Sequence, residues 1–128
     1  ELQRLEDEPD VETTLLIHPG VLQDFFAYNE FLDAADALLS YLELEGVFQV
    51  ASFHPDYQFA GTDAGAAENY TNRSPYPMLH LLREASLEAA IDHYPDVDGI
   101  PDRNIALMNE LGVEKMRTIL KRCTDAET

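Results

Sequence analysis

Three histidines and one aspartate stand where this chain could carry out chemistry. His18 and His54 each follow an apolar, partly β-branched stretch, Asp56 follows His54 by two residues, and His80 lies in a leucine-rich segment. Imidazole changes charge near neutral pH and serves as a general base or a metal ligand. The pattern predicts catalysis by His54, Asp56 and His18. Alternatively, His18, His54 and His80 would bind a divalent transition metal such as zinc, iron or manganese.

Two isolated arginines are candidates for substrate binding. Between residues 5 and 102 the chain has twenty acidic residues, but its only cations there are Arg73 and Arg83. A guanidinium group suits carboxylate and phosphate, so the pattern predicts a small anionic substrate, with Tyr57 and Asn72 as further binding residues. The alternative is that both arginines neutralise neighbouring acids in a purely structural role.

Composition and charge exclude several classes of function. The net charge of −17 over 128 residues disfavours nucleic acid and anionic membranes as partners, because both need clustered Lys and Arg. No stretch is long and apolar enough for a membrane span, and no signal peptide is recognisable. A single cysteine excludes an internal disulfide and favours a cytoplasmic protein.

The elements that would position these residues read as a βαβ unit. Residues 13–17 and 47–53 are apolar on both faces, which is typical of strands in a parallel sheet. Between them, residues 21–44 carry an apolar stripe at helical spacing, and Gly46 is expected to end that helix. The fold class expected is α/β, a small parallel sheet flanked by helices, with the first two histidines at the carboxyl ends of the strands where ligands bind.

The rest of the chain continues this pattern. Residues 60–74 form a polar loop of the length that is usually functional or disordered, and residues 76–93 read as a helix that carries His80 in its first turns. The C-terminal part is expected to be helical, with two short helices joined at Gly112 and a frayed tail: 102–111, 113–123 and 124–128.

A chain of this length is expected to form a single α/β domain over residues 1–128. Residues 1–8 resemble the last turns of a helix, so the sequence predicts that an N-terminal segment with the start of that helix is missing. Two strands are too few for a stable sheet. A third is therefore expected either from an upstream strand or from pairing across a homodimer.

Several strings in the chain resemble a known family. The strings are ETTLLIHPGVLQDF, FHPDYQFAGT, ENYTNRSPYP and HLLREAS, and the similarity extends over residues 12–112. They resemble a bacterial family of small cytosolic proteins described only as a domain of unknown function. Its members carry a further N-terminal segment with a GLNLCPF-like stretch and another strand, which this sequence does not match. The resemblance implies one constellation of residues and assigns no activity to it.

Two classes of function remain open. The histidine and aspartate pattern favours an enzyme of unknown class that acts on a small anionic molecule, with or without a metal. The alternative is a non-catalytic module that binds a ligand or another protein and in which the histidines are structural.

Overall fold

A computed structural model describes residues 1–125 as a three-stranded antiparallel sheet with helices, an α+β arrangement. The elements, in chain order, are α1 (Leu2–Asp7), β1 (Thr14–Ile17), α2 (Phe25–Tyr41), β2 (Phe48–Phe53), η1 (Ala67–Asn72), β3 (Met78–Arg83), α3 (Glu84–His93), η2 (Val97–Gly99), α4 (Ile100–Leu111) and α5 (Val113–Asp125).

The expected parallel sheet is wrong. The strand order is β1-β3-β2, and β3 runs antiparallel to both neighbours. Because β1 and β2 are antiparallel to the same strand, they still point in the same direction. Ile17 and Phe53 are both paired with Met78, so β1 and β2 do end at one edge of the sheet.

The error comes from Met78–Arg83, which the sequence places in a helix. In the structure Leu79 and Leu81 are buried while His80 and Leu82 are only half-buried. This period of two marks a strand, but in a leucine-rich run it is hidden because leucines at 79 and 82 also fit a helical spacing. The third strand therefore comes from within the chain, and three strands form without an upstream segment or a second copy.

Helix α2 begins and ends with recognisable caps. The Asp24 carboxylate accepts a hydrogen bond from the backbone N–H of Ala27 at 3.0 Å, which is an N-cap. At the other end the N–H of Glu43 bonds the Ser40 carbonyl and the N–H of Leu44 bonds the Leu39 carbonyl. These two bonds form a Schellman motif, and its left-handed residue is Glu43, with φ 58°, rather than the expected Gly46.

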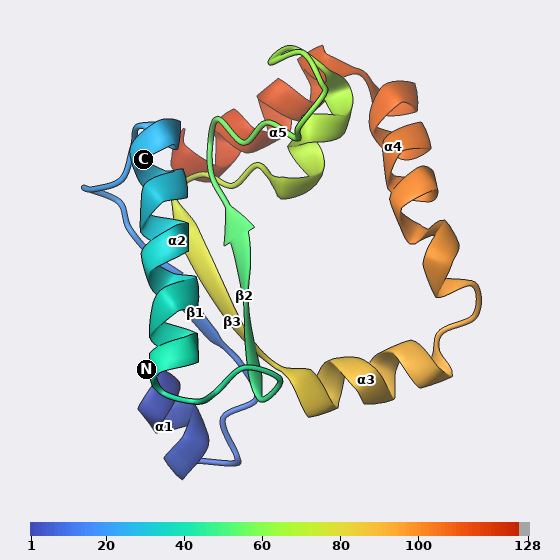
Figure 1. The fold of residues 1–128 in the computed structure, drawn as a ribbon. Helices are drawn as coiled ribbons and strands as arrows, with labels where there is room; N and C mark the ends of the chain where they lie inside the picture. Colours follow the sequence, from blue (N-terminus) through green and yellow to red (C-terminus); the bar gives the residue numbers. More distant parts are fainter. Residues whose placement is uncertain (126–128) are drawn as a thin grey trace.

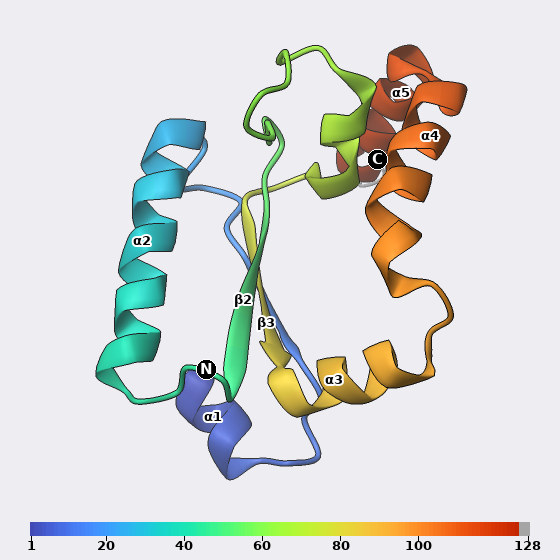
Figure 2. The same cartoon turned by 45° about the vertical axis from the view of Figure 1, so that its right-hand side comes forward.

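One face of the sheet carries the core. Helices α1 and α2 lie on this face, and Figures 1 and 2 show α2 running along the strands. The core cluster contains Leu5, Leu39, Leu44, Phe48 and Leu81. The opposite face carries Leu15 and Ile17, each 51% exposed.

The C-terminal helices form a separate layer. The two helices expected here are confirmed as α4 and α5, which meet at Gly112, where φ is +84°. In both views α4 stands apart from the strands, and it packs chiefly against η1 and α5. The expected frayed tail is helical as far as Asp125, and its remainder lies outside the described residues. No helix in the described part of the chain is long and apolar enough to cross a bilayer.

Candidate functional site

His54 is a fully buried residue of the aromatic core between α2 and the loop that follows β2. This loop, residues 54–77, is called the β2–β3 connection below. The imidazole is 0% exposed, and its ring centroid lies 5.2 Å from that of Phe25 and 4.9 Å from that of Tyr28. At the end of β2 the His54 side chain therefore lies in the interior beneath α2, and not in an open crevice.

Both ring nitrogens of His54 are bound to the backbone. Nδ1 accepts a hydrogen bond from the N–H of Asp56 at 2.9 Å, and Nε2 lies 2.9 Å from the carbonyl oxygen of Leu22. An N–H donor opposite Nδ1 requires a lone pair there, so the proton is on Nε2, which donates to Leu22, and the ring is neutral. Asp56 contacts the imidazole through its backbone while its side chain is exposed. His54 therefore closes the loop and has no free nitrogen for a substrate.

The Arg73 side chain stabilises the β2–β3 connection by bonding backbone carbonyls of the same loop. Its Nε donates to the Tyr57 carbonyl at 3.0 Å, its Nη2 donates to the Ala64 carbonyl at 2.7 Å, and its guanidinium lies 4.6 Å from the centroid of the Tyr70 ring. Tyr57 also packs by its ring against Phe25, at 5.5 Å. The guanidinium expected to hold a substrate instead bonds loop carbonyls.

Asn72 ties the far end of the connection to β2. Its Nδ2 donates to the Ser52 carbonyl at 3.1 Å, and its own carbonyl accepts the N–H of His54 at 3.2 Å. Asn72 therefore acts on the loop geometry through both its side chain and its backbone.

Asn69 is a structural residue that the sequence reasoning missed. Its side chain is 0% exposed. Oδ1 accepts hydrogen bonds from the Phe59 N–H at 2.9 Å and from the Thr62 hydroxyl at 3.0 Å. Nδ2 donates to the Asp63 carbonyl at 2.8 Å. A buried asparagine with three bonds fixes the local chain path. The sequence feature that could have indicated this role is the position of Asn69 in the loop FAGTDAGAAENY. In such a loop a side-chain amide can hydrogen-bond backbone groups that have no partner in a helix or strand.

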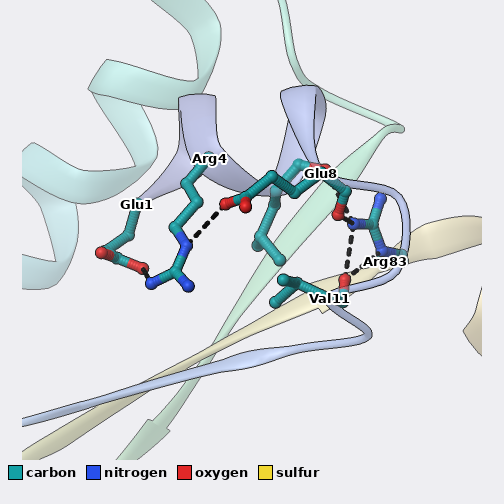
Figure 3. A network of polar contacts seen from close by, with 6 residues as sticks. Glu1, Arg4, Glu8, Val11 and Arg83 are labelled. Carbon is teal, nitrogen blue, oxygen red and sulfur yellow. Dashed lines mark hydrogen bonds and ion pairs between the residues drawn. The ribbon is translucent and has the colours of Figure 1, made fainter.

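Arg83 lies at the opposite end of the sheet and latches α1 to it (Figure 3). It ends β3 five residues after Met78, about 17 Å along the strand. Its Nε and Nη2 donate to the Val11 carbonyl at 3.0 and 2.6 Å, and Nη2 also reaches the carbonyls of Leu5 at 2.7 Å and Glu8 at 3.0 Å. The two arginines therefore do not converge on one anion, and both bond carbonyl oxygens near helix and loop ends.

The other two histidines lie on opposite faces of the sheet. His18 contacts the ring of Phe31 in α2 at 6.3 Å, and its Nε2 is buried without a hydrogen-bond partner among the described residues. His80 pairs with Leu15, whose side chain is on the open face, and its ring is 6.5 Å from that of Phe53. Within residues 1–125 no group of three or more His, Cys, Asp or Glu side chains is arranged to hold a metal ion. The three histidines expected as ligands are therefore not gathered.

Among residues 1–125, a larger and a smaller cavity are of a size that could hold a small molecule. The larger, about 560 Å³, lies between α2 and the core face of the sheet and is lined chiefly by aliphatic side chains such as Ala35, Leu38, Val50 and Leu79. Helix α2 thus covers the sheet loosely. The cavity has almost no polar group to orient a ligand.

The smaller cavity, about 390 Å³, has a mixed lining and lies where the β2–β3 connection meets α4. We call it the connection cavity. Its residues come from the loop, from η1 and from α4: Phe59, Ala60, Thr62, Glu68, Thr71, Pro101, Asn104 and Ile105. This combination of apolar walls and a few polar groups is typical of small-molecule sites.

Four polar side chains line the connection cavity, and three of them have no partner within residues 1–125. The hydroxyl of Thr62 lies 2.7 Å from the Phe59 carbonyl oxygen and 3.0 Å from Asn69 Oδ1. The side chains of Glu68, Thr71 and Asn104 make no hydrogen bond or ion pair in the part of the chain that the structure describes. In the same loop Asn69 and Arg73 are bonded to backbone groups. The loop is therefore held by its own hydrogen bonds, while the side chains of Glu68, Thr71 and Asn104 remain available to a ligand.

The fold and this site define a small α+β domain with a fastened loop that forms one wall of a mixed polar and apolar cavity. The chain belongs to the family described as "Protein of unknown function (DUF1415)", whose model matches residues 1–118. Neither the comparison with curated proteins nor that with solved structures found a match.

Proposed function

We propose that this domain is a non-catalytic module that binds a small molecule in the connection cavity. The observation that carries the proposal is the contrast between the bonded polar groups of Asn69 and Arg73 and the unbonded side chains of Glu68 and Thr71 in the same loop, with Asn104 of α4 opposite them. Water satisfies such groups in the free protein, and a ligand with matching groups gains affinity by displacing it. A volume of about 390 Å³ is within the range of small-molecule pockets.

The geometry supports this class better than an enzyme that acts on an anionic substrate. Acid–base catalysis needs a histidine nitrogen within reach of the substrate, and both nitrogens of His54 are bound to the backbone. An anion clamp needs free donors, whereas Arg73 and Arg83 bond loop and helix carbonyls. In the FHPDYQFAGT and ENYTNRSPYP strings, His54 and Arg73 thus stabilise the loop, while other residues of the same strings line the connection cavity.

The many hydrogen bonds within the β2–β3 connection are consistent with a role in ligand binding. Binding residues on loops need a rigid support, because a site that must be ordered on binding loses affinity. Arg73, Asn69 and Asn72 order the connection in advance, so that η1 presents its free groups to α4 without a rearrangement.

A ligand-observed NMR screen tests the proposal. A fragment library with cationic, neutral and anionic members is mixed with the native chain, with Ala60→Phe and with Ala64→Phe. Ala60 lines the cavity and Ala64 does not, although both are exposed residues of the same loop. We expect fragments whose saturation-transfer signal falls at least threefold with Ala60→Phe and is unchanged with Ala64→Phe.

Circular dichroism and thermal unfolding of the two variants establish that each has the native fold. If every fragment that binds the native protein binds Ala60→Phe equally well, or if no fragment binds, the connection cavity is not a ligand site.

A further inference from the structure

The charge of the connection cavity comes from one carboxylate. Glu68 and Thr71 are three residues apart in η1, and in a 3₁₀-helix residues at this spacing lie on the same face. Glu68 is half-buried and has no cationic partner among residues 1–125. A free carboxylate and a free hydroxyl are thus presented side by side to the cavity.

The opposite wall comes from α4. Pro101 and Ile105 are four residues apart, and Asn104 is three from Pro101, so the three lie on one helical face. Phe59 from the loop and Pro101 and Ile105 from α4 add apolar side chains to the lining. The cavity therefore offers an unbonded carboxylate, hydroxyl and amide together with apolar side chains.

The N-terminus of α4 attracts anions only weakly at this cavity. The cavity lies near the first turn of α4, where helix N–H groups attract negative charge. However, Pro101 has no N–H, Asp102 places a carboxylate in the same turn, and the neighbouring Arg103 is bonded to Asp96. The net charge of −17 acts in the same direction, since it raises the local concentration of cations.

We infer that the ligand of the connection cavity is a small organic cation, a primary ammonium group on an apolar body. This inference rests on the proposed function. The ammonium group donates to the carboxylate of Glu68 and to the oxygens of Thr71 and Asn104. The apolar body lies between Phe59 and Ile105. Three N–H donors suit three acceptors, and an ammonium ion has no acceptor of its own to leave unpaired.

Three probes of nearly equal shape separate charge from cavity filling: 2-phenylethylammonium, 2-phenylethanol and phenylacetate. Dissociation constants are measured by NMR titration with the native chain, Glu68→Gln and Glu88→Gln. Glu88 is an exposed residue of α3 outside the cavity, so Glu88→Gln makes the same change in net charge. Ala60→Phe reports whether each probe occupies the connection cavity.

We expect 2-phenylethylammonium to bind at least tenfold more tightly than the other two probes. Glu68→Gln should remove that preference, Glu88→Gln should keep it, and raised salt should weaken it. One outcome would contradict the cation but keep the proposed function: all three probes bind equally, Glu68→Gln has no effect, and Ala60→Phe still blocks binding. The cavity would then be a ligand site that does not select for positive charge. If phenylacetate binds best, the sign of the charge is wrong. If no probe binds and Ala60→Phe changes nothing in the fragment screen, both proposals fail.

Discussion

The Nε2 atom of His54 holds the carbonyl oxygen of Leu22 at 2.9 Å, and Leu22 has a left-handed backbone with φ 64°. A non-glycine residue in this conformation costs on the order of 1 kcal/mol and persists where its surroundings fix it. The buried imidazole is such a surrounding, because its other nitrogen is bound to the N–H of Asp56. One ring thus joins the turn before α2 to the turn after β2.

From this relationship we expect His54→Ala to lower the free energy of unfolding by about 3 kcal/mol, through an empty cavity and two unpaired backbone groups. The matched change is His80→Ala, on a half-buried ring without a hydrogen bond among the described residues, and it should cost less than about 1 kcal/mol. Urea unfolding measures both. Equal losses in the two variants would show that the two backbone hydrogen bonds of His54 do not stabilise the fold.

Arg83 gives a second stability prediction. Arg83→Met keeps the apolar stem but leaves the carbonyls of Leu5 and Val11 without their side-chain donor, whereas the Glu8 carbonyl still accepts the Val11 N–H. We expect a loss of about 2 to 3 kcal/mol by urea unfolding.

Arg4→Met is the control for the loss of one positive charge. Arg4 forms only exposed ion pairs with Glu1 and Glu8, and such pairs contribute about 0.5 kcal/mol or less (Figure 3). A small effect at Arg83, similar to that at Arg4, would mean that Arg83 is available for a ligand after all.

Tyr28 gives stability a dependence on alkaline pH. Burial raises the pKa of its hydroxyl from 10.0 to about 12, opposed by the Phe53 N–H, which donates to the phenolic oxygen. The hydroxyl itself donates to the Met78 carbonyl at 2.6 Å. Because the folded pKa is the higher one, the phenol's stabilisation is complete below pH 10 and is lost as pH rises from 10 to about 12.

The shift corresponds to roughly 2 to 3 kcal/mol at its full extent. Urea unfolding of the native chain and of Tyr28→Phe between pH 8 and pH 11.5 should give a difference in stability that is constant to pH 10 and then shrinks. In the absorbance difference between the two proteins, one phenol should ionise near pH 12. A difference in stability that does not change with pH would contradict this account.

The Schellman motif after α2 offers a stabilising change. Glu43 occupies its left-handed position with φ 58° and an exposed side chain, so glycine would relieve the strain without removing a buried contact. We expect Glu43→Gly to raise the free energy of unfolding by about 0.5 to 1 kcal/mol. Glu43→Ala removes the same carboxylate but keeps the strained conformation. If both variants are stabilised equally, the gain comes from charge and not from φ.

The sequence by itself determined the local elements and some of their limits. Apolar runs of β-branched residues located β1 and β2, the stripe at helical spacing located α2, and Gly112 separated α4 from α5. These features depend on residues close together in the chain, where periodicity and glycine have direct effects. That His18 and His54 follow strands ending at one edge was also correct, although the reason given was a parallel pairing that does not exist.

Only the tertiary structure decided the role of each candidate residue. The segment Met78–Arg83 fits a helix as well as a strand, and the pairing of two distant strands with it selects the strand. That choice turned His80 to the open face and carried Arg83 to the end of the sheet remote from His54. Whether a histidine or arginine is free depends on which carbonyls the folded chain leaves near it, and those of Leu22, Leu5 and Ala64 come from other turns of the chain. The connection cavity depends on the same long-range packing, because η1 and α4 are adjacent in space but separated in sequence.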